Sequence, residues 1–214
     1  MRGKWMDKMI NKEMPFSNKK YEVLFLTNNQ NTMELYNWLS DKCTIKLYDD
    51  PLSIDLIKKW NPDLVISYNY KYIIGQEVID YMQGRIINLH ISLLPWNRGS
   101  NPNIWSFIDS TPKGVTIHEI SSKLDRGKII YQQECVFDEN VETFESSYCK
   151  LHQTMIGLFQ RNWDNIKLGK YELQEQQGKG SYHNNKDLEK LKSICPFTWS
   201  DNISDYMKRY SESI

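Results

Sequence analysis

The chain has 214 residues, which is enough for one domain with its own core and a modest additional segment. Lys and Arg together number 27, as do Asp and Glu, so the net charge is near zero and a large basic surface for nucleic acid is excluded. No stretch approaches the roughly 20 apolar residues needed to cross a bilayer. Residues 1–20 are polar and lack the apolar segment of a signal peptide, so we expect a cytoplasmic protein with a short N-terminal extension.

The first half of the chain alternates between short apolar runs and amphipathic stretches. Residues 21–27 (YEVLFLT) form an apolar run between polar neighbours, which is typical of a buried strand. The elements predicted next, in chain order, are a helix over 33–42, a strand over 43–48, a helix over 52–60 opened by Pro51, a strand over 63–67, a helix over 75–82 and a strand over 85–90.

The second half opens with a loop over residues 91–100 that is rich in Pro, Asn, Arg and Gly. The elements predicted after it are a helix over 101–109, strands over 114–120 and 128–137, and a helix over 141–168. The remaining residues, 169–214, are more polar and less periodic, and predict a small C-terminal appendage. Alternating strands and helices indicate an α/β fold with a mostly parallel sheet, in which ligands bind at the carboxyl ends of the strands.

Asn88 and His90 lie at the carboxyl end of the fourth predicted strand. Residues two apart in a strand share a face, so these side chains project together. An amide can donate a hydrogen bond to the negative charge that builds on a carbonyl oxygen under attack by an amine. An imidazole can move the protons of that reaction near neutral pH. Such residues also commonly satisfy nearby backbone groups, so the pair alone leaves both interpretations open.

The loop after the next predicted strand adds a carboxylate. Residues 124–127 read Leu-Asp-Arg-Gly, and Gly127 allows a tight turn that can direct Asp125 back toward His90. A carboxylate there would favour the protonated imidazolium and could hold a water that relays protons. The alternative is an aspartate that only caps its turn.

Five short blocks, in this order and spacing, resemble the folate-dependent formyltransferase family. The blocks are Asn88-Leu89-His90, Ser92-Leu93-Leu94-Pro95, Arg98-Gly99, Gly114-Val115-Thr116-Ile117-His118 and Leu124-Asp125-x-Gly127. The resemblance implies a Rossmann-like catalytic domain over residues 21–168 and N10-formyltetrahydrofolate as the formyl donor. Residues 169–214 would then be an appendage that serves dimerisation or contacts the substrate.

The resemblance also assigns roles. Asn88 would stabilise the oxyanion, His90 would act as general acid and base, and Asp125 would fix His90 and a proton-relay water. The pterin ring of the donor would lie between backbone segments around residues 67–72 and 120–124. The donor-binding candidates are Ser67, Tyr68, Tyr70, Tyr72, Leu94, Ile120 and Leu124.

Three acceptors occur in the family. The tRNA enzymes add a larger, basic C-terminal domain, which the short segment 169–214 and the zero net charge argue against. The purine-pathway enzyme, glycinamide ribonucleotide formyltransferase, holds a phosphate on a glycine-rich turn after the first strand. The matching turn here, residues 27–31, has no glycine, which weakens this alternative without removing it, because Asn tolerates similar backbone angles.

The sugar-nucleotide branch remains, since residues 66–74, 95–99 and 180–188 resemble it. We therefore predict transfer to the amine of a nucleotide-linked amino-deoxysugar, with dTDP-4-amino-4,6-dideoxyglucose the best candidate. The substrate-binding candidates are Trp96, Arg98, Trp105 and Tyr182, of which the three aromatic residues could stack on base or sugar or belong to the core.

His118 is expected on the site face of its strand, in a structural role. His90, His118 and Asp125 could be interpreted as a metal triad, but no His-x-His or His-x-x-x-His spacing supports one, so we predict no metal. The four cysteines include no Cys-x-x-Cys pair and are expected to be reduced.

A protein of another class, one that binds folate or a nucleotide sugar without catalysis, would share this fold. Such a binder has no need of the trio Asn88, His90 and Asp125, and all three are present, which favours the enzyme. The resemblance further implies a homodimer whose ligands are small molecules, with no nucleic acid and no membrane as partners.

Overall fold

The computed structural model describes residues 20–214, so the extension predicted for residues 1–20 lies outside the described part except for Lys20. The elements in chain order are β1 (Glu22–Leu26), a 3-10 turn (Gln30–Thr32), α1 (Met33–Ser40), β2 (Thr44–Tyr48), α2 (Ile54–Trp60), β3 (Leu64–Tyr68), α3 (Gln76–Met82), β4 (Ile86–His90), β5 (Arg98–Gly99), α4 (Pro102–Ile108), β6 (Gly114–Glu119), β7 (Ile129–Glu134), α5 (Phe144–Leu168), β8 (Tyr182–His183), α6 (Asn185–Ile194) and α7 (Ile203–Glu212).

A six-stranded sheet in the order β2-β1-β3-β4-β6-β7 forms the centre of the molecule. The first four of these strands are parallel, whereas β6 runs antiparallel to β4 and β7 antiparallel to β6. The prediction of a mostly parallel α/β sheet flanked by helices is confirmed. The order places β4 at the middle of the sheet, between the parallel and the antiparallel parts.

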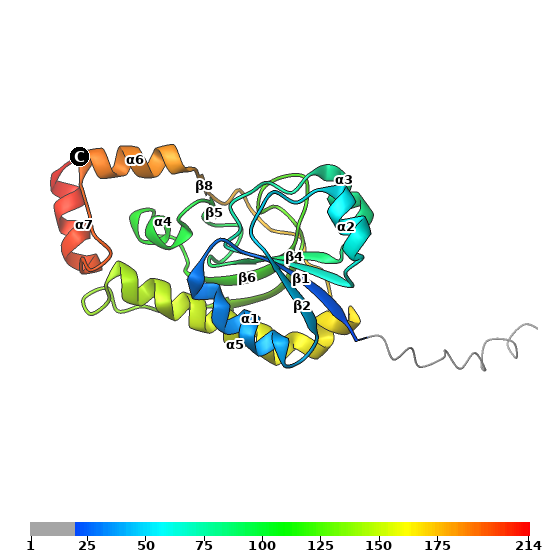
Figure 1. The fold of residues 1–214 in the computed structure, drawn as a ribbon. Helices are drawn as coiled ribbons and strands as arrows, with labels where there is room; N and C mark the ends of the chain where they lie inside the picture. Colours follow the sequence, from blue (N-terminus) through cyan, green and yellow to red (C-terminus); the bar gives the residue numbers. More distant parts are fainter. Residues whose placement is uncertain (1–19) are drawn as a thin grey trace, which may run out of the picture.

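Helices cover both faces of the sheet (Figure 1). On one face, α1 and α5 pack through Leu35, Leu39, Met155 and Phe159 against inward-facing strand residues. On the other face, the shorter α2 and α3 form a separate core with β1, β3 and β4. Because the central strands are buried on both faces, their sequences are nearly continuous apolar runs, as is usual for parallel sheets.

Two predicted helix starts differ from the structure because of capping. The helix predicted from residue 52 begins at Ile54, since the Ser53 hydroxyl accepts a hydrogen bond from the Leu56 N–H and acts as the N-cap. The helix predicted from residue 141 begins at Phe144, after a capping box between Thr143 and Ser146. In the same region β7 ends at Glu134, three residues before the predicted end.

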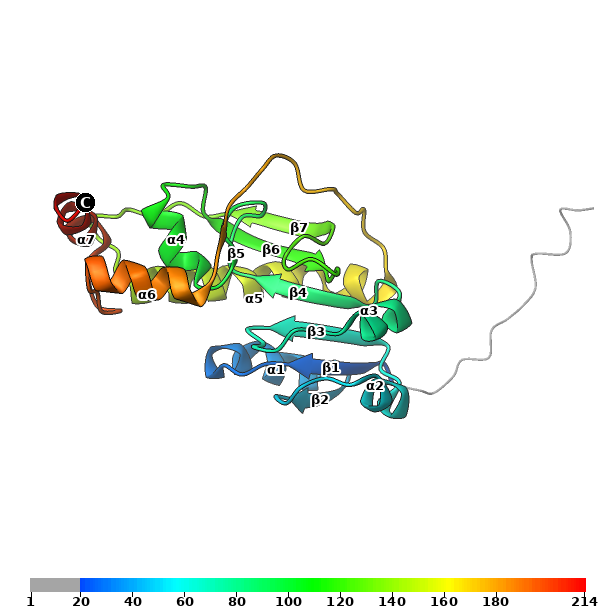
Figure 2. The same cartoon turned by 90° about the horizontal axis from the view of Figure 1, so that it is seen from above.

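The C-terminal segment is more regular than its composition indicates. It contains α6 and α7, which pack on α4 and on Phe144, the first residue of α5, in a third apolar cluster. Strand β8 pairs in parallel with β5, with Arg98 opposite Tyr182 and Gly99 opposite His183. Figure 2 shows the long connection from α5 to β8 arching past the β7 edge of the sheet before it reaches β5. None of the helices between residues 20 and 214 has both the length and the apolar character needed to span a bilayer.

Candidate active site

Strand β4 presents Asn88 and His90 on one face at the carboxyl end of the sheet. Its other residues, Ile86, Ile87 and Leu89, are buried and anchor the strand between β3 and β6. The antiparallel neighbour β6 places His118 directly opposite Asn88. Two side chains predicted from the sequence and a third from the next strand therefore meet at one point.

Asp125 lies in the loop between β6 and β7, with a left-handed backbone (φ 50°), and is only 8% exposed. Its carboxylate accepts hydrogen bonds from Asn88 Nδ2 at 3.3 Å and from the Gly99 backbone N–H at 2.8 Å. Gly127 allows this tight turn, because a Cβ there would lie 1.6 Å from the Glu119 carbonyl oxygen. Asp125 thus points back at the carboxyl end of β4, as the sequence predicted.

Two histidines face this carboxylate. His90 Nδ1 lies 3.8 Å from Asp125 Oδ2, and His118 Nε2 lies 3.7 Å from Oδ1. Burial alone would raise the pKa of Asp125, but His90, His118, the Gly99 N–H and Arg98 together hold that pKa below its usual value. Asp125 is therefore ionised at neutral pH and is the negative centre of the site.

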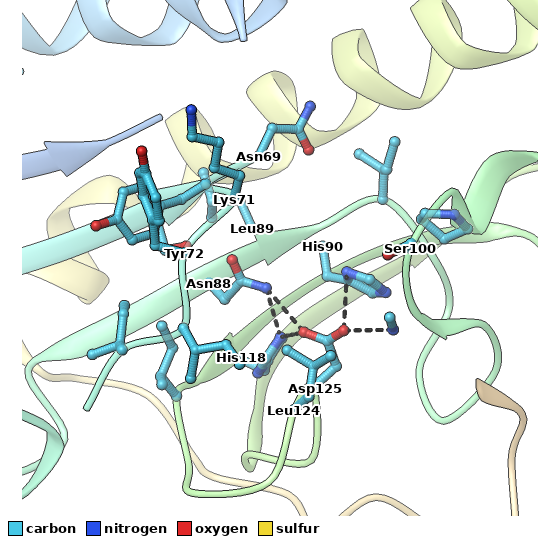
Figure 3. A pocket seen from close by; sticks show the side chains of 18 of the residues that line it. Asn69, Lys71, Tyr72, Asn88, Leu89, His90, Ser100, His118, Leu124 and Asp125 are labelled. Atoms are coloured by element: carbon cyan, nitrogen blue, oxygen red, sulfur yellow. Dashed lines mark hydrogen bonds and ion pairs between the residues drawn. The ribbon is translucent and has the colours of Figure 1, made fainter. Parts of the chain in front are cut away.

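His118 is 1% exposed, and this burial lowers its pKa to about 4, so the ring is neutral at neutral pH. Its Nδ1–H donates to the Glu119 carbonyl oxygen at 2.7 Å, which leaves Nε2 as an acceptor for Asn88 Nδ2 at 3.2 Å. Both N–H groups of Asn88 are thus engaged, one by His118 and one by Asp125. Figure 3 shows the amide oxygen of Asn88 turned away from these two partners.

His90 is 7% exposed and meets oxygen acceptors on both sides of its ring. Its Nε2–H donates to the Asn97 carbonyl oxygen at 3.0 Å, while Nδ1 faces the Asp125 carboxylate. Each ring nitrogen therefore has an oxygen atom facing it, one of a carbonyl and one of a carboxylate. This geometry suits a residue that accepts and releases protons beside a reacting group.

These side chains open onto a cavity of about 510 Å³, the size of a small-molecule site. Its walls come from the ends of β3, β4 and β6, the loops that follow them, and the start of α6. The lining residues are Ser67, Asn69, Tyr70, Lys71, Tyr72, Ile73, Ile74, Asn88, Leu89, His90, Ile91, Gly99, Ser100, Asn101, Pro102, His118, Ile120, Ser121, Ser122, Leu124, Asp125 and Asn185. No group of histidine, cysteine or acidic side chains suited to hold a metal is found within residues 20–214.

Most of the predicted donor-binding residues line this cavity. They are Ser67, Tyr70, Tyr72, Ile120 and Leu124. Tyr68 does not, because adjacent strand residues point to opposite faces; it is fully buried and its hydroxyl donates to His152 Nδ1 on α5 at 2.5 Å. Leu94 is also buried away from the cavity, and its backbone N–H donates to the Thr116 hydroxyl.

None of the four predicted substrate-binding residues lines the cavity. Trp105 is buried and stacks on His183 at 3.8 Å between ring centroids. Arg98 is 3% exposed and directs its guanidinium toward the segment after α5. Tyr182 is half-exposed on β8, opposite Arg98, and Trp96 is partly buried in the loop before β5.

Sequence reasoning did not select several polar residues of the cavity wall. Asn69, Ser100, Asn101 and Asn185 are among them. Asn185 lies in the block over residues 180–188 that resembled the sugar-nucleotide branch, so a signal for it existed. Asn69 and Asn101 have left-handed backbones, which Asn tolerates well. Asn69 lies in the 67–72 segment expected to hold the pterin but was not selected itself, whereas no sequence pattern marked Asn101.

The comparisons with known proteins decide the family. Residues 21–160 match the formyl transferase domain. The chain belongs to the formyl transferase family. The resemblance inferred from the five sequence blocks is thereby confirmed, and the match spans every strand of the six-stranded sheet and most of α5.

The names of two relatives within the formyl transferase family include a sugar nucleotide. The chain is 36% identical over 132 residues to dTDP-4-amino-4,6-dideoxyglucose formyltransferase of Mycobacterium tuberculosis. The aligned part covers 62% of this chain and 55% of that protein. It is 39% identical, with a TM-score of 0.80, to the structure of the formyltransferase PseJ from Anoxybacillus kamchatkensis in complex with UDP-4,6-dideoxy-4-formamido-L-AltNAc and tetrahydrofolate. That match covers 88% of this chain and 99% of PseJ.

A third relative is a tRNA enzyme. The chain is 38% identical over 92 residues to methionyl-tRNA formyltransferase of Syntrophomonas wolfei, which covers 42% of this chain and 29% of that protein. The chain thus spans little more than half of the mycobacterial relative and under a third of the tRNA enzyme. In contrast, the match to PseJ spans almost the whole of that protein.

Proposed function

We propose that this protein transfers a formyl group from N10-formyltetrahydrofolate to the amine of a nucleotide-linked 4-amino-4,6-dideoxysugar. The observation that carries the proposal is the convergence of Asn88, His90 and Asp125 on one ligand-sized cavity. The similarity to PseJ supports a sugar nucleotide as acceptor, because it covers 88% of this chain and 99% of that protein, whose structure holds a UDP-linked formamido sugar.

In the proposed reaction, the acceptor amine attacks the formyl carbon, a new C–N bond forms, and the bond between that carbon and the donor nitrogen breaks. The amine must lose a proton and the donor nitrogen must gain one. His90 would carry this proton, and Asp125 would hold His90 in place and stabilise its charged form. The Asn97 carbonyl and the Asp125 carboxylate, on either side of His90, support this role in proton transfer.

Asn88 would stabilise the negative charge that develops on the formyl oxygen. Since both of its N–H groups are engaged by His118 and Asp125, the formyl oxygen would share one of them or replace one partner. The neutral His118, which accepts from Asn88 Nδ2, fixes the orientation of the amide and keeps its N–H groups on the side of Asp125. The donor's pterin would lie between the wall at Ser67, Tyr70 and Tyr72 and the wall at Ile120 and Leu124.

The best single acceptor candidate is dTDP-4-amino-4,6-dideoxyglucose, supported by the mycobacterial relative. The match to PseJ favours a second candidate, a UDP-linked 4-amino-4,6-dideoxy sugar. Both names place the amine or formamide at carbon 4, so we propose that position for this protein and leave the base to experiment. We also propose a cytoplasmic homodimer, in which residues 21–168 form the catalytic unit.

The test is a formyl-transfer assay with N10-formyltetrahydrofolate and a panel of acceptors. The panel contains the dTDP- and UDP-linked 4-amino sugars, the dTDP-linked 3-amino isomer and glycinamide ribonucleotide, with product measured by mass. Turnover on one 4-amino sugar nucleotide supports the proposal and identifies the base. Turnover on glycinamide ribonucleotide alone would assign the protein to purine synthesis. Tight binding of folate or sugar nucleotide without turnover would identify a binding protein.

A further inference from the structure

The segment between α5 and β8, residues 169–181, passes the β7 edge of the sheet on its way to β5 without forming a helix or a strand (Figure 2); we call it the strap. It is attached to the body at two places. Gln174 exchanges two backbone hydrogen bonds with Ile129 at the start of β7, at 2.8 and 2.9 Å. Ser181 N–H donates to the Pro95 carbonyl, and Arg98 N–H donates to the Ser181 carbonyl. Between these points the strap passes the turn that carries Asp125.

Gln176 on the strap bonds directly to that turn. Its Nε2 donates to the carbonyl oxygens of Asp125 at 2.8 Å and of Gly127 at 2.9 Å. Its Oε1 accepts from two nitrogens of Arg98, Nε at 3.0 Å and Nη2 at 2.7 Å. Both donors and both lone pairs of the amide are therefore used. Gln176 is partly buried, whereas the strap residues on either side of it are exposed.

Arg98 is a buried cation whose hydrogen-bond partners are neutral. Its guanidinium bonds to Gln176 Oε1 and to the Lys179 carbonyl oxygen, and within residues 20–214 it forms no ion pair with a carboxylate. Its charge is nevertheless felt by Asp125, since Arg98 is one of the groups that lower the pKa of that carboxyl. The Gly99 N–H, next in sequence, bonds directly to Asp125 Oδ2.

We propose that Gln176 is a positioning residue for the catalytic carboxylate: it ties the left-handed turn at Asp125 to Arg98 and keeps the charge of Arg98 available to Asp125. A neutral amide is required for both tasks. A carboxylate at this position would repel the two carbonyl oxygens and would neutralise Arg98. This inference rests on the role of Asp125 in the proposed function, and it gives the strap a part in catalysis beyond connecting α5 to β8.

Three variants test it. Gln176→Met keeps the length of the side chain and removes all four hydrogen bonds. Gln176→Glu keeps an acceptor for Arg98 but removes the donors and adds a charge. Gln177→Met is the matched control, because Gln177 is exposed and, among residues 20–214, its side chain forms one hydrogen bond, to the Glu175 carbonyl at 3.4 Å.

We expect Gln176→Met to lower kcat at least about tenfold, with KM for both substrates within about twofold of wild type, the pattern of a misplaced catalytic group. Gln177→Met should match wild type. In Gln176→Glu the acid limb of the kcat profile should move to higher pH, because the added carboxylate neutralises Arg98 and Asp125 loses its influence. The other titratable or charged groups near Asp125 are His90 from β4 and the neutral His118 from β6, with Arg126 next to it on the turn. All three stay unchanged in these variants.

A second readout does not depend on turnover. The carboxyl carbon of Asp125, assigned with Asp125→Asn in protein labelled with carbon-13 aspartate, can be titrated by NMR in each variant. An upward shift of its midpoint in Gln176→Glu, absent in Gln177→Met, supports the inference even if no acceptor in the panel is formylated. Wild-type kcat and an unmoved Asp125 titration in both Gln176 variants would overturn it. So would a loss of activity that only tracks a lower melting temperature, with the acid limb unmoved.

Discussion

At the scale of single residues, the site depends on which atoms of three side chains face one another. His118 is neutral and accepts a hydrogen bond, so Asn88 must turn its N–H groups toward His118 and Asp125. His90 in turn lies between the Asn97 carbonyl and the Asp125 carboxylate. A single change in this set alters the partners of all its members, because each donor is matched to one acceptor.

His90→Asn should lower kcat at least about a hundredfold, the usual scale for loss of a general acid and base. Asn retains a polar group at the Asn97 carbonyl but cannot exchange a proton near neutral pH. Acceptor binding, measured by calorimetry with the donor product present, should be mostly retained. Turnover close to wild type would show that another group carries the proton.

A second histidine, His152 on α5, is predicted to control stability rather than activity. Burial lowers its pKa to about 4, and Tyr68 donates a hydrogen bond to its neutral ring. Between about pH 6.5 and pH 4 the unfolded chain takes up a proton at this residue and the folded chain does not. The free energy of unfolding should therefore fall as the pH is lowered through that window, by about 1.4 kcal/mol per pH unit.

Replacing both partners, Tyr68→Phe with His152→Leu, should remove this contribution without leaving a buried hydroxyl unpaired. Urea unfolding at pH values from 7 to 4.5 measures the slope. Tyr68→Phe alone should keep the wild-type slope, because burial is the cause of the pKa shift at His152. His118, with a pKa lowered in the same direction, contributes a second and separate part of the slope. An unchanged slope in the double variant would contradict the assignment to His152.

At the scale of elements, the strap differs from the helices and strands in how it is held in place. Tyr171 near its start packs against the main core and Tyr131, and the later part depends on polar contacts and backbone geometry at a few points. Gly180 has a φ of 62°, and a Cβ there would lie 2.0 Å from the Pro95 carbonyl oxygen. Gly178 has a φ of 82°, but open space surrounds the position of its Cβ. Both glycines have a left-handed backbone, and only Gly180 also lies close to another part of the chain, the Pro95 carbonyl.

Gly180→Ala should therefore lower kcat, whereas Gly178→Ala should not. Both variants strain a left-handed backbone, at a cost of about 1 kcal/mol each. Only Gly180→Ala also forces the strap away from the loop over residues 95–100, whose Asn97 carbonyl holds His90. Steady-state kinetics and melting temperatures of both variants separate the two effects. Equal kcat values would mean that the close contact at Pro95 does not matter to the site.

The sequence predicted the elements of the sheet well because their signals are local. Apolar runs bounded by turn residues marked the six strands, and strand periodicity placed Asn88 and His90 on one face. The helix starts were wrong by two or three residues where a capping side chain, Ser53 or Thr143, overrode the apolar pattern. Tyr68 and its neighbour Ser67 were both assigned to the donor site. Adjacent strand residues point to opposite faces, so only Ser67 lines the cavity.

The strap could not be predicted in the same way. Gln176 contacts residues 49 to 78 positions away in the sequence, and nothing in its own neighbourhood indicates this. Arg98 was assigned to substrate because it lies in the block over residues 95–99 that resembles the sugar-nucleotide branch. Its burial depends on the strap folding over it, which only the tertiary structure reveals. The parts of the site that rest on local pattern were predictable, and those that rest on long-range polar contacts were not.

At the scale of the whole molecule, the C-terminal helices share a core with the catalytic part. Tyr206 of α7 is fully buried, packs against Phe144 and Phe197, and donates its hydroxyl to the Cys195 carbonyl. The same cluster includes Trp105 and Phe107 of α4. The appendage predicted for residues 169–214 therefore packs against the helix that follows the catalytic loop.

Tyr206→Ala should reduce the free energy of unfolding by about 3–5 kcal/mol, the cost of a large buried cavity. Because the cluster joins α6 and α7 to α4 and α5, we expect one urea transition shifted to lower concentration. Tyr206→Phe, which loses only the hydroxyl bond, should cost about 1 kcal/mol. An early, separate transition confined to the C-terminal helices would instead show that they unfold independently of the sheet.

The position of the strap also bears on how the protein is made. Every strand of the large sheet, and all of α5, precedes residue 169 in the chain. A ribosome that has released residues 20–168 has therefore already supplied Asn88, His90 and Asp125, yet Gln176 and Ser181 have still to be translated. In a chain interrupted at residue 168, the turn at Asp125 would lack its hydrogen-bond partners on the strap. The complete site then needs residues 176–181, which are translated later than every strand of the large sheet.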